Sequence, residues 1–148
     1  MQLNRIVHAH LGFQNILLTA DRDVKLADFG GSSIDGSRSY AFPSAKCRRT
    51  SAIAPAVRPP GPPESLHWEP KIREDTFALG MMVFELWTNN SLYQGLSNAE
   101  ILDLHDRKIW PSTDIIQEEA VRDVLVKCWS GTTDAAHVAA ILEKELRE

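Results

Sequence analysis

The sequence predicts a mainly α-helical domain that carries one short β-hairpin near its N-terminus. Three observations lead to this fold class. Two short apolar runs separated by a turn lie within residues 1–30, a stretch rich in Ser, Gly, Pro and Arg fills residues 31–70, and helical periodicity follows from residue 71. A chain of 148 residues has the size of one ordinary domain, so we expect a single core.

The hairpin is predicted from Ile16–Leu18 and Val24–Ala27, which flank the turn-forming residues Ala20–Asp23. The stretch that follows contains five prolines, and these exclude a regular helix or a central strand there. They are Pro55, Pro59, Pro60, Pro62 and Pro63. We therefore expect a long loop, and loops of this length in a compact domain are usually functional or disordered.

Four helices are predicted in the C-terminal half. Phe77–Trp87 is apolar on nearly every face, as a helix buried on all sides would be. Ser97 and Glu100 form a capping box ahead of the second helix. Two further segments, Ala120–Cys128 and Val138–Leu146, repeat apolar residues at helical spacing, and Thr133 or Asp134 could cap the last one.

Composition excludes several classes of function. The hydrophobic fraction of 43% and charged fraction of 24% are typical of a globular protein. A formal net charge of −4 gives no drive toward nucleic acid or anionic membranes, so neither is expected as a partner. Cys47 and Cys128 lie far apart, which predicts neither a cysteine metal site nor a disulfide framework and favours a cytoplasmic location.

The motif with the most chemical content is Val24–Gly30, VKLADFG, preceded by Asn15 and the apolar run ILL. Here the sequence resembles the protein kinase family, in which an asparagine closes the catalytic loop and a second strand delivers an Asp-Phe-Gly. The resemblance implies that Asn15 and Asp28 supply oxygen ligands to the magnesium that accompanies ATP. It also implies structural roles for Phe29, which packs inward, and Gly30.

Later residues extend the resemblance. Pro62-Pro63-Glu64 stands where kinases close the activation segment, and Asp75 begins DTFALG, similar to the start of the buried central helix of the kinase C-lobe. In the family this aspartate bonds to the catalytic-loop backbone; the alternative is that Asp75 only caps a helix. With KCW at Lys127–Trp129, the chain resembles a divergent kinase-like branch found largely in fungi.

The resemblance implies a protein-kinase-like C-lobe with the N-lobe absent. It divides the chain into a catalytic-loop and hairpin part (1–30), an activation-segment-like loop (31–64) and a helical lobe (65–148). No glycine-rich loop and no strand lysine precede His8, and in kinases these parts hold the nucleotide.

The catalytic loop departs from the family's His-Arg-Asp-Leu-Lys-x-x-Asn pattern at three functional positions. The corresponding segment, His8–Asn15, keeps the histidine, leucine and asparagine, so His8 is expected to be structural. His10 replaces the catalytic aspartate, Gly12 replaces the phosphate-steadying lysine and Ala9 replaces the arginine. An imidazole has a suitable pKa for a base but contributes no negative charge, which alone leaves catalysis open. Together with the missing glycine-rich loop and strand lysine, it leads us to expect that His10 is non-functional.

These observations leave three interpretations. The chain is a catalytically inactive, pseudokinase-like interaction module, a segment of an active ATP-dependent kinase whose N-lobe lies outside it, or a degenerate gene product. The first implies a protein partner; Mg and ATP would be cofactors only of an active form, and this chain alone is expected to bind neither. We also expect Ile6, Val7, Leu11 and Phe13 to be exposed, so that the chain self-associates or depends on a partner covering residues 1–30.

Two smaller features have alternatives. His8 and His10 could offer two zinc ligands, but no third ligand is evident nearby. Lys46, Arg48 and Arg49 form a small basic cluster, for which a solvated loop is the simpler interpretation and a docking or nucleic-acid patch the alternative.

Overall fold

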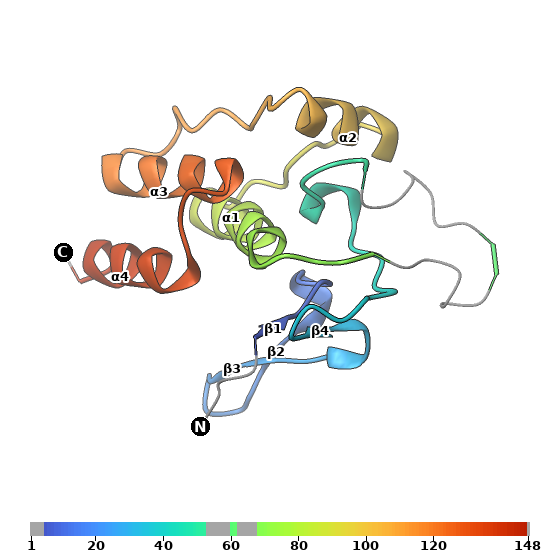
Figure 1. Cartoon of the computed structure of the whole chain (residues 1–148). Helices are drawn as coiled ribbons and strands as arrows, with labels where there is room; N and C mark the ends of the chain where they lie inside the picture. The colour runs from blue at the N-terminus through green and yellow to red at the C-terminus, as the bar shows by residue number, and fades with distance from the viewer. Residues whose placement is uncertain (1–4, 53–59, 62–67, 148) are drawn as a thin grey trace.

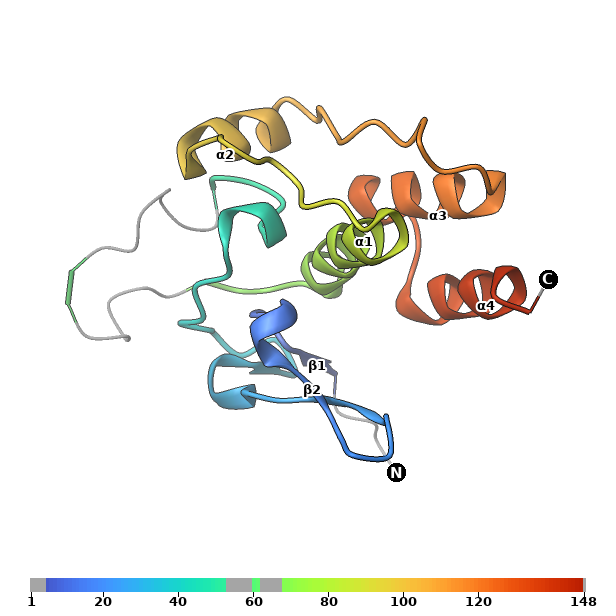
Figure 2. The same cartoon turned by 180° about the vertical axis from the view of Figure 1, so that it is seen from behind.

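The computed structural model describes residues 5–52, 60–61 and 68–147, and within them helices predominate. The elements are β1 (Ile6–Val7), β2 (Ile16–Leu18), β3 (Val24–Leu26), β4 (Ser33–Ile34), α1 (Ile72–Thr88), α2 (Asn98–Asp106), α3 (Glu119–Ser130) and α4 (Ala135–Glu145). Helix α1 lies in the middle, with the strands on one side and α2 on the other (Figures 1 and 2). The mainly helical fold with short antiparallel strands agrees with the sequence prediction.

Helix α1 is the hub of the core. Phe77 and Met81 are 0% and 1% exposed, so the helix is buried on most sides, as its apolar sequence predicts. Helix α3 packs on it and α4 packs on α3, with one continuous apolar cluster. The fully buried members from these two helices are Val121, Val124, Leu125, Cys128, Trp129 and Val138. This cluster fixes α1, and α1 in turn carries the residues that reach the N-terminal strands.

The ends of α2, α3 and α4 carry residues that cap the helices. The Ser97 hydroxyl accepts from the Glu100 N–H, and the Glu100 side chain accepts from the Ser97 N–H, which confirms the capping box. Asp134, rather than Thr133, caps α4 by accepting from the His137 N–H. Helix α3 ends at Gly131, whose φ of 75° is the left-handed conformation that glycine adopts without strain.

The predicted hairpin is present, and a second strand pair accompanies it. Strands β2 and β3 are antiparallel, with Ile16 opposite Leu26 and Leu18 opposite Val24. Strand β4 lies inside the segment expected to be loop and pairs with β1, placing Val7 opposite Ser33. Two-residue strands have no period that a sequence pattern can show, so this pairing was not predicted.

Exposure of the N-terminal apolar residues is only partly as expected. Ile6 and Phe13 are 52% and 39% exposed, and Leu11 is intermediate. Val7, however, is 6% exposed, so the expectation that it faces water is wrong. Strand β1 contacts α1, and alternation along the strand turns Val7 toward the helix while Ile6 faces outward.

The basic cluster in the loop is not a solvated surface. Lys46 Nζ lies 2.9 Å from both carboxylate oxygens of Glu85 on α1. Arg49 donates from Nη2 to Glu74 Oε1 at 3.1 Å, also on α1. Arg48 is 1% exposed, with its guanidinium 4.7 Å from the centre of the Phe42 ring. The cluster therefore anchors this part of the loop to the central helix.

One expectation falls outside the described part of the chain. The Pro62-Pro63-Glu64 segment, and with it the expected role of Glu64, lies outside the described residues. Across the described ranges, no helix combines the length and the apolar character needed to cross a membrane.

Helices α1 and α3 approach closely at Gly80. A Cβ atom at this position would lie 2.6 Å from Cys128 Cβ and 2.9 Å from Trp129 Nε1. Both neighbours are buried, and Cys128 Cβ is fixed by the α3 backbone, so α3 must shift to accept a methyl group.

We expect Gly80→Ala to lower the free energy of unfolding by about 2 kcal/mol, measured by urea denaturation. Overpacking costs about 1–3 kcal/mol, and the contact is severe enough to outweigh the helix-propensity gain of about 1 kcal/mol. Gly30→Ala is a matched control, because its new methyl group would meet Asp28 Oδ1 at an ordinary 3.6 Å. An unchanged or raised stability of Gly80→Ala would contradict this close packing.

Candidate functional site

The first turn of α1 holds the His8–Asn15 loop through one carboxylate. Asp75 Oδ2 accepts from the His8 N–H at 2.6 Å, and Asp75 Oδ1 accepts from the Ala9 N–H at 2.9 Å. This is the contact expected between Asp75 and the loop backbone, and it rules out a mere helix cap, since the N-cap of α1 is Lys71. Burial raises the pKa of Asp75, and the two backbone hydrogen bonds oppose that shift.

The loop held by Asp75 is strained at Ala9. Its φ of 65° is in the left-handed region, which costs a residue with a Cβ about 1–2 kcal/mol. Ala9 is 3% exposed and packs in a small cluster with Ala41 and Trp68. A strained residue persists when its surroundings over-determine it, and here Asp75 and the cluster do so.

His8 connects the loop to the segment after β3. Its Nε2 lies 2.8 Å from the Ala27 carbonyl oxygen, which can only accept, so Nε2 carries the proton. Nδ1 is then free to accept from the His10 N–H at 3.3 Å. The His8 ring also meets the Phe29 ring edge-on, with centroids 4.9 Å apart. Phe29 therefore packs against His8 although it stays 50% exposed.

Asn15, His10 and Asp28 gather at the other end of the loop. Asn15 is 6% exposed, and its Nδ2 donates to the His10 carbonyl oxygen at 2.8 Å. The Ala27 N–H donates to the Asn15 carbonyl oxygen at 2.9 Å, which holds the two segments side by side. His10 Nδ1 lies 3.7 Å from Asp28 Oδ2, and Asp28 adopts a left-handed φ of 61°.

The Asn15 and Asp28 side chains suit a magnesium–phosphate group in the type of donor atom that they offer. Asn15 Oδ1 and the Asp28 carboxylate are hard oxygen donors, and Mg²⁺ often takes one or two protein ligands and completes its shell with phosphates and water. Over the described residues, no three His, Cys, Asp or Glu side chains are grouped to hold a metal ion, so the His8–His10 pair gains no third zinc ligand there. Gly30 lies in a turn of 3-10 helix, Phe29–Gly31, that begins directly after Asp28.

Several residues that support the loop were not singled out from the sequence. Ser32 Oγ donates to the His8 carbonyl oxygen at 3.2 Å. Ser39 and Trp68 exchange two backbone hydrogen bonds, of 2.7 and 2.9 Å, and Trp68 Nε1 donates to the Ala41 carbonyl oxygen. A lone tryptophan in a polar stretch is a signal for such an anchor, because its large apolar body and single donor favour a buried, bonded position.

Comparison with known proteins decides the family. Residues 1–144 match the family model for protein tyrosine and serine/threonine kinases. The chain belongs to the protein kinase family. The His8–Asn15 loop, the Asp28-Phe29-Gly30 turn and Asp75 are therefore parts of a kinase-family chain.

Individual kinases show the same similarity along most of the chain. The tyrosine-protein kinase SRK2 of Spongilla lacustris is 25% identical over 130 residues, which cover 87% of this chain and 34% of that protein. Protein kinase C-like 1 of Caenorhabditis elegans is 28% identical over 90% of this chain and 17% of its own length. The cyclin-dependent kinase 4 homolog of the same organism is 32% identical over 81% of this chain and 29% of its own length. The chain thus spans about a third or less of the length of these relatives.

We expect Asp75→Asn to lower the free energy of unfolding by about 1–3 kcal/mol, because an amide keeps one acceptor and turns an NH₂ group toward the second backbone N–H. Urea denaturation measures the loss. Asp134→Asn is the control, since Asn and Asp cap helices about equally well, and it should change stability by less than about 0.5 kcal/mol. Equal effects of the two substitutions would show that Asp75 does not hold the loop.

Proposed function

We propose that this kinase-family chain corresponds to the C-terminal lobe of a kinase domain and acts as a pseudokinase-type interaction module without phosphotransferase activity of its own. The order of elements supports the lobe assignment: a loop ending in Asn15, a hairpin, the Asp28-Phe29-Gly30 turn, a long segment and then a buried central helix. In this proposal residues 31–64 correspond to the activation segment.

The observation that carries the proposed inactivity is the contact of His10 with Asp28. Protein kinases place a carboxylate at the position of His10 to accept the proton of the substrate hydroxyl. Here an imidazole stands 3.7 Å from the carboxylate that the family uses to hold magnesium. A protonated His10 would compete with the metal for Asp28, and a neutral His10 would leave the hydroxyl without a negatively charged acceptor.

Gly12 stands where the family's catalytic loop has a second catalytic group, the lysine that steadies the phosphate. Gly12 has no side chain to steady the transferring phosphoryl group, and its φ of 177° is extended backbone that any residue could adopt. A Cβ there would meet only the Gln14 amide, the end of a flexible side chain. The backbone conformation therefore does not require glycine, and a Cβ could be accommodated if the Gln14 amide moved.

The remaining site residues have framework or binding roles in this proposal. Asn15 and Asp28 would hold Mg²⁺, and ATP bound with it would supply the phosphoryl group. His8, Phe29, Gly30 and Asp75 would keep the loop and the turn in place, as their contacts support. In the described part of the chain these side chains form one wall of such a site, and we infer that the chain alone retains neither Mg nor ATP.

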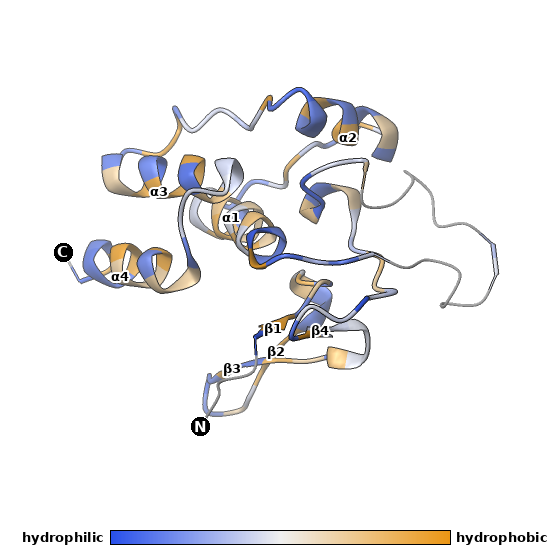
Figure 3. Cartoon of the chain, in the orientation of Figure 1, coloured by the Kyte–Doolittle hydropathy of each residue, from blue (hydrophilic) through white to orange (hydrophobic). Residues whose placement is uncertain are grey.

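The β-hairpin supports a protein partner or self-association. Leu17, Leu18 and Val24 are 54%, 69% and 65% exposed, and Figure 3 shows the apolar colouring that extends along these strands. Exposed apolar surface of this kind is typical of an interface. A covering lobe or partner would remove it from water.

A second candidate is a segment of an active kinase. The length of the relatives favours it. The match covers 34% of one relative and 17% of another, so these proteins are about three to six times longer than the part that matches. In that case the nucleotide-binding parts would lie outside this chain, and His10 would have to act as the base.

We expect no incorporation of labelled phosphate from ATP into the chain or into Ser-, Thr- and Tyr-containing peptides, with magnesium or manganese present. The double substitution of His10→Asp with Gly12→Lys should not create activity, because positioning of the nucleotide supplies most of the acceleration. Turnover by the wild-type chain that is abolished by both His10→Ala and Asp28→Ala would overturn the proposed inactivity.

A further inference from the structure

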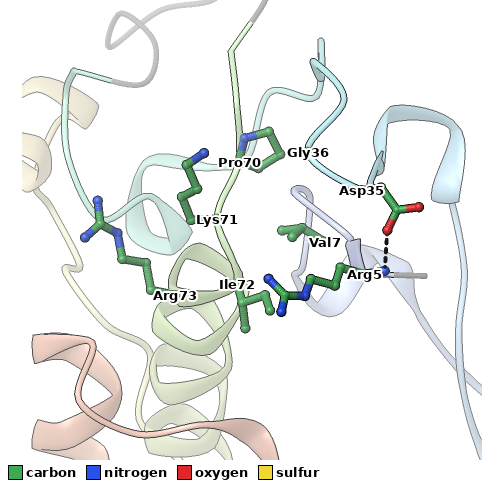
Figure 4. A pocket seen from close by; sticks show the side chains of 8 residues that line it. All are labelled: Arg5, Val7, Asp35, Gly36, Pro70, Lys71, Ile72 and Arg73. Atoms are coloured by element: carbon green, nitrogen blue, oxygen red, sulfur yellow. Dashed lines mark hydrogen bonds between the residues drawn. The ribbon is translucent and has the colours of Figure 1, made fainter. Parts of the chain in front are cut away.

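A hollow of about 700 Å³ lies between β1, the turn after β4 and the start of α1, away from His10 and Asp28. Figure 4 shows the side chains that line it, which include Arg5, Val7, Asp35, Lys71, Ile72 and Arg73. We refer to it as the basic hollow. Its volume is in the range of sites that hold small ligands or short peptide segments.

The basic hollow concentrates positive charge on a chain whose formal net charge is −4. Three cationic side chains and one carboxylate line it. The carboxylate is already engaged, since Asp35 Oδ1 accepts from the Arg5 backbone N–H at 2.9 Å. The Asp35 N–H in turn donates to the Arg5 carbonyl oxygen at 2.8 Å. These bonds fix the backbone around Arg5 and use none of its guanidinium nitrogens, so with respect to the described residues the guanidinium can contact a ligand.

The other two cations are only weakly neutralised. Lys71 Nζ lies 3.8 Å from Glu69 Oε2, and both side chains are about 60% exposed, a pairing of little strength. Arg73 Nε lies 3.4 Å from Glu74 Oε1, an oxygen that Arg49 also uses at 3.1 Å. Both head groups could therefore exchange these contacts for those of a bound anion.

The arrangement of charge and apolar surface indicates the kind of ligand. Figure 4 shows the head groups of Lys71 and Arg73 separated from each other and from the Arg5 guanidinium, so they do not converge on one point. Between them lie apolar side chains, including Ile72, which is 54% exposed. Separated cations with apolar surface between them complement several carboxylates flanking an apolar side chain, rather than one phosphate.

We propose that the basic hollow binds an acidic peptide segment of a partner protein in extended conformation, with carboxylates at the three cations and an apolar side chain on Ile72. Extended peptides present neighbouring side chains at separate positions, which such spacing requires. The binding depends on none of the residues proposed to hold magnesium, so it holds whether or not the chain transfers phosphate.

Fluorescence anisotropy of a fluorescein-labelled peptide, EDLEIED, with the full chain tests the proposal. We expect saturable binding that weakens as salt is raised from about 50 to about 300 mM, because the charges are exposed. The amide analogue QNLQIQN should not bind measurably, and EDAEAED should bind several-fold more weakly than EDLEIED. These three arms use the wild-type protein and do not depend on how a variant folds.

Charge reversal then locates the site. Arg5→Glu should raise the dissociation constant of EDLEIED by about tenfold, since it replaces an attraction by a repulsion. The exposed Lys25 on β3 provides the control, with the same charge change outside the basic hollow. Lys25→Glu should change the constant by less than about twofold.

The proposal would be overturned by a lack of saturable EDLEIED binding, by equal binding of QNLQIQN, or by equal effects of Arg5→Glu and Lys25→Glu. It would also be overturned if inorganic phosphate displaced the peptide at concentrations where chloride of equal ionic strength has no effect. The last would assign the basic hollow to a phosphate group. Self-association that Arg5→Glu abolishes, measured by sedimentation without peptide, would assign it instead to a second copy of the chain.

Discussion

The contact between the Asp75 carboxylate and the backbone of His8 and Ala9 is the interaction on which the rest of the candidate site depends. It crosses 67 positions of sequence and joins the most buried helix of the chain to a short, irregular loop. Burial of Asp75 disfavours its ionised form, as the raised pKa shows, and the two N–H donors compensate for part of that cost. They also offset the left-handed conformation of Ala9. With this backbone fixed, His8 can reach Ala27 and Phe29, and the His10 carbonyl can receive Asn15.

In this kinase-family chain, the atoms that hold the His8–Asn15 loop in place differ from the side-chain atoms that the proposed chemistry concerns. Asp75, His8 and Asn15 act on backbone groups, and backbone groups are the same for every residue type at positions 9, 10 and 12. Differences from the family's pattern at those positions therefore alter side chains without removing a hydrogen bond that holds the loop. Under the proposed function, this separation would allow the loop to keep its backbone hydrogen bonds beside a His10 that does not act as a base.

The sequence predicted those features that local rules determine. The hairpin, the Ser97–Glu100 capping box and the Asp134 cap depend on residues a few positions apart, and the burial of α1 follows from its composition. The Asp75 contact was expected only through the resemblance to kinases, because no local pattern links residue 75 to residue 8. The pairing of β1 with β4, the burial of Val7 and the ion pairs of Lys46 and Arg49 also depend on long-range packing, which the sequence pattern does not contain. The basic hollow also depends on long-range packing, since Arg5 and Lys71 are brought together only by the fold.

Amide hydrogen exchange of the wild-type chain tests the central claim most directly. If Asp75 holds the loop, the His8 and Ala9 amides should exchange slowly, at rates close to those of Phe77–Trp87 in α1. The Val24 amide, at a non-hydrogen-bonded position of the exposed hairpin, should exchange much faster in the same sample. Exchange of the His8 and Ala9 amides as fast as that of Val24, beside a protected α1, would contradict the account.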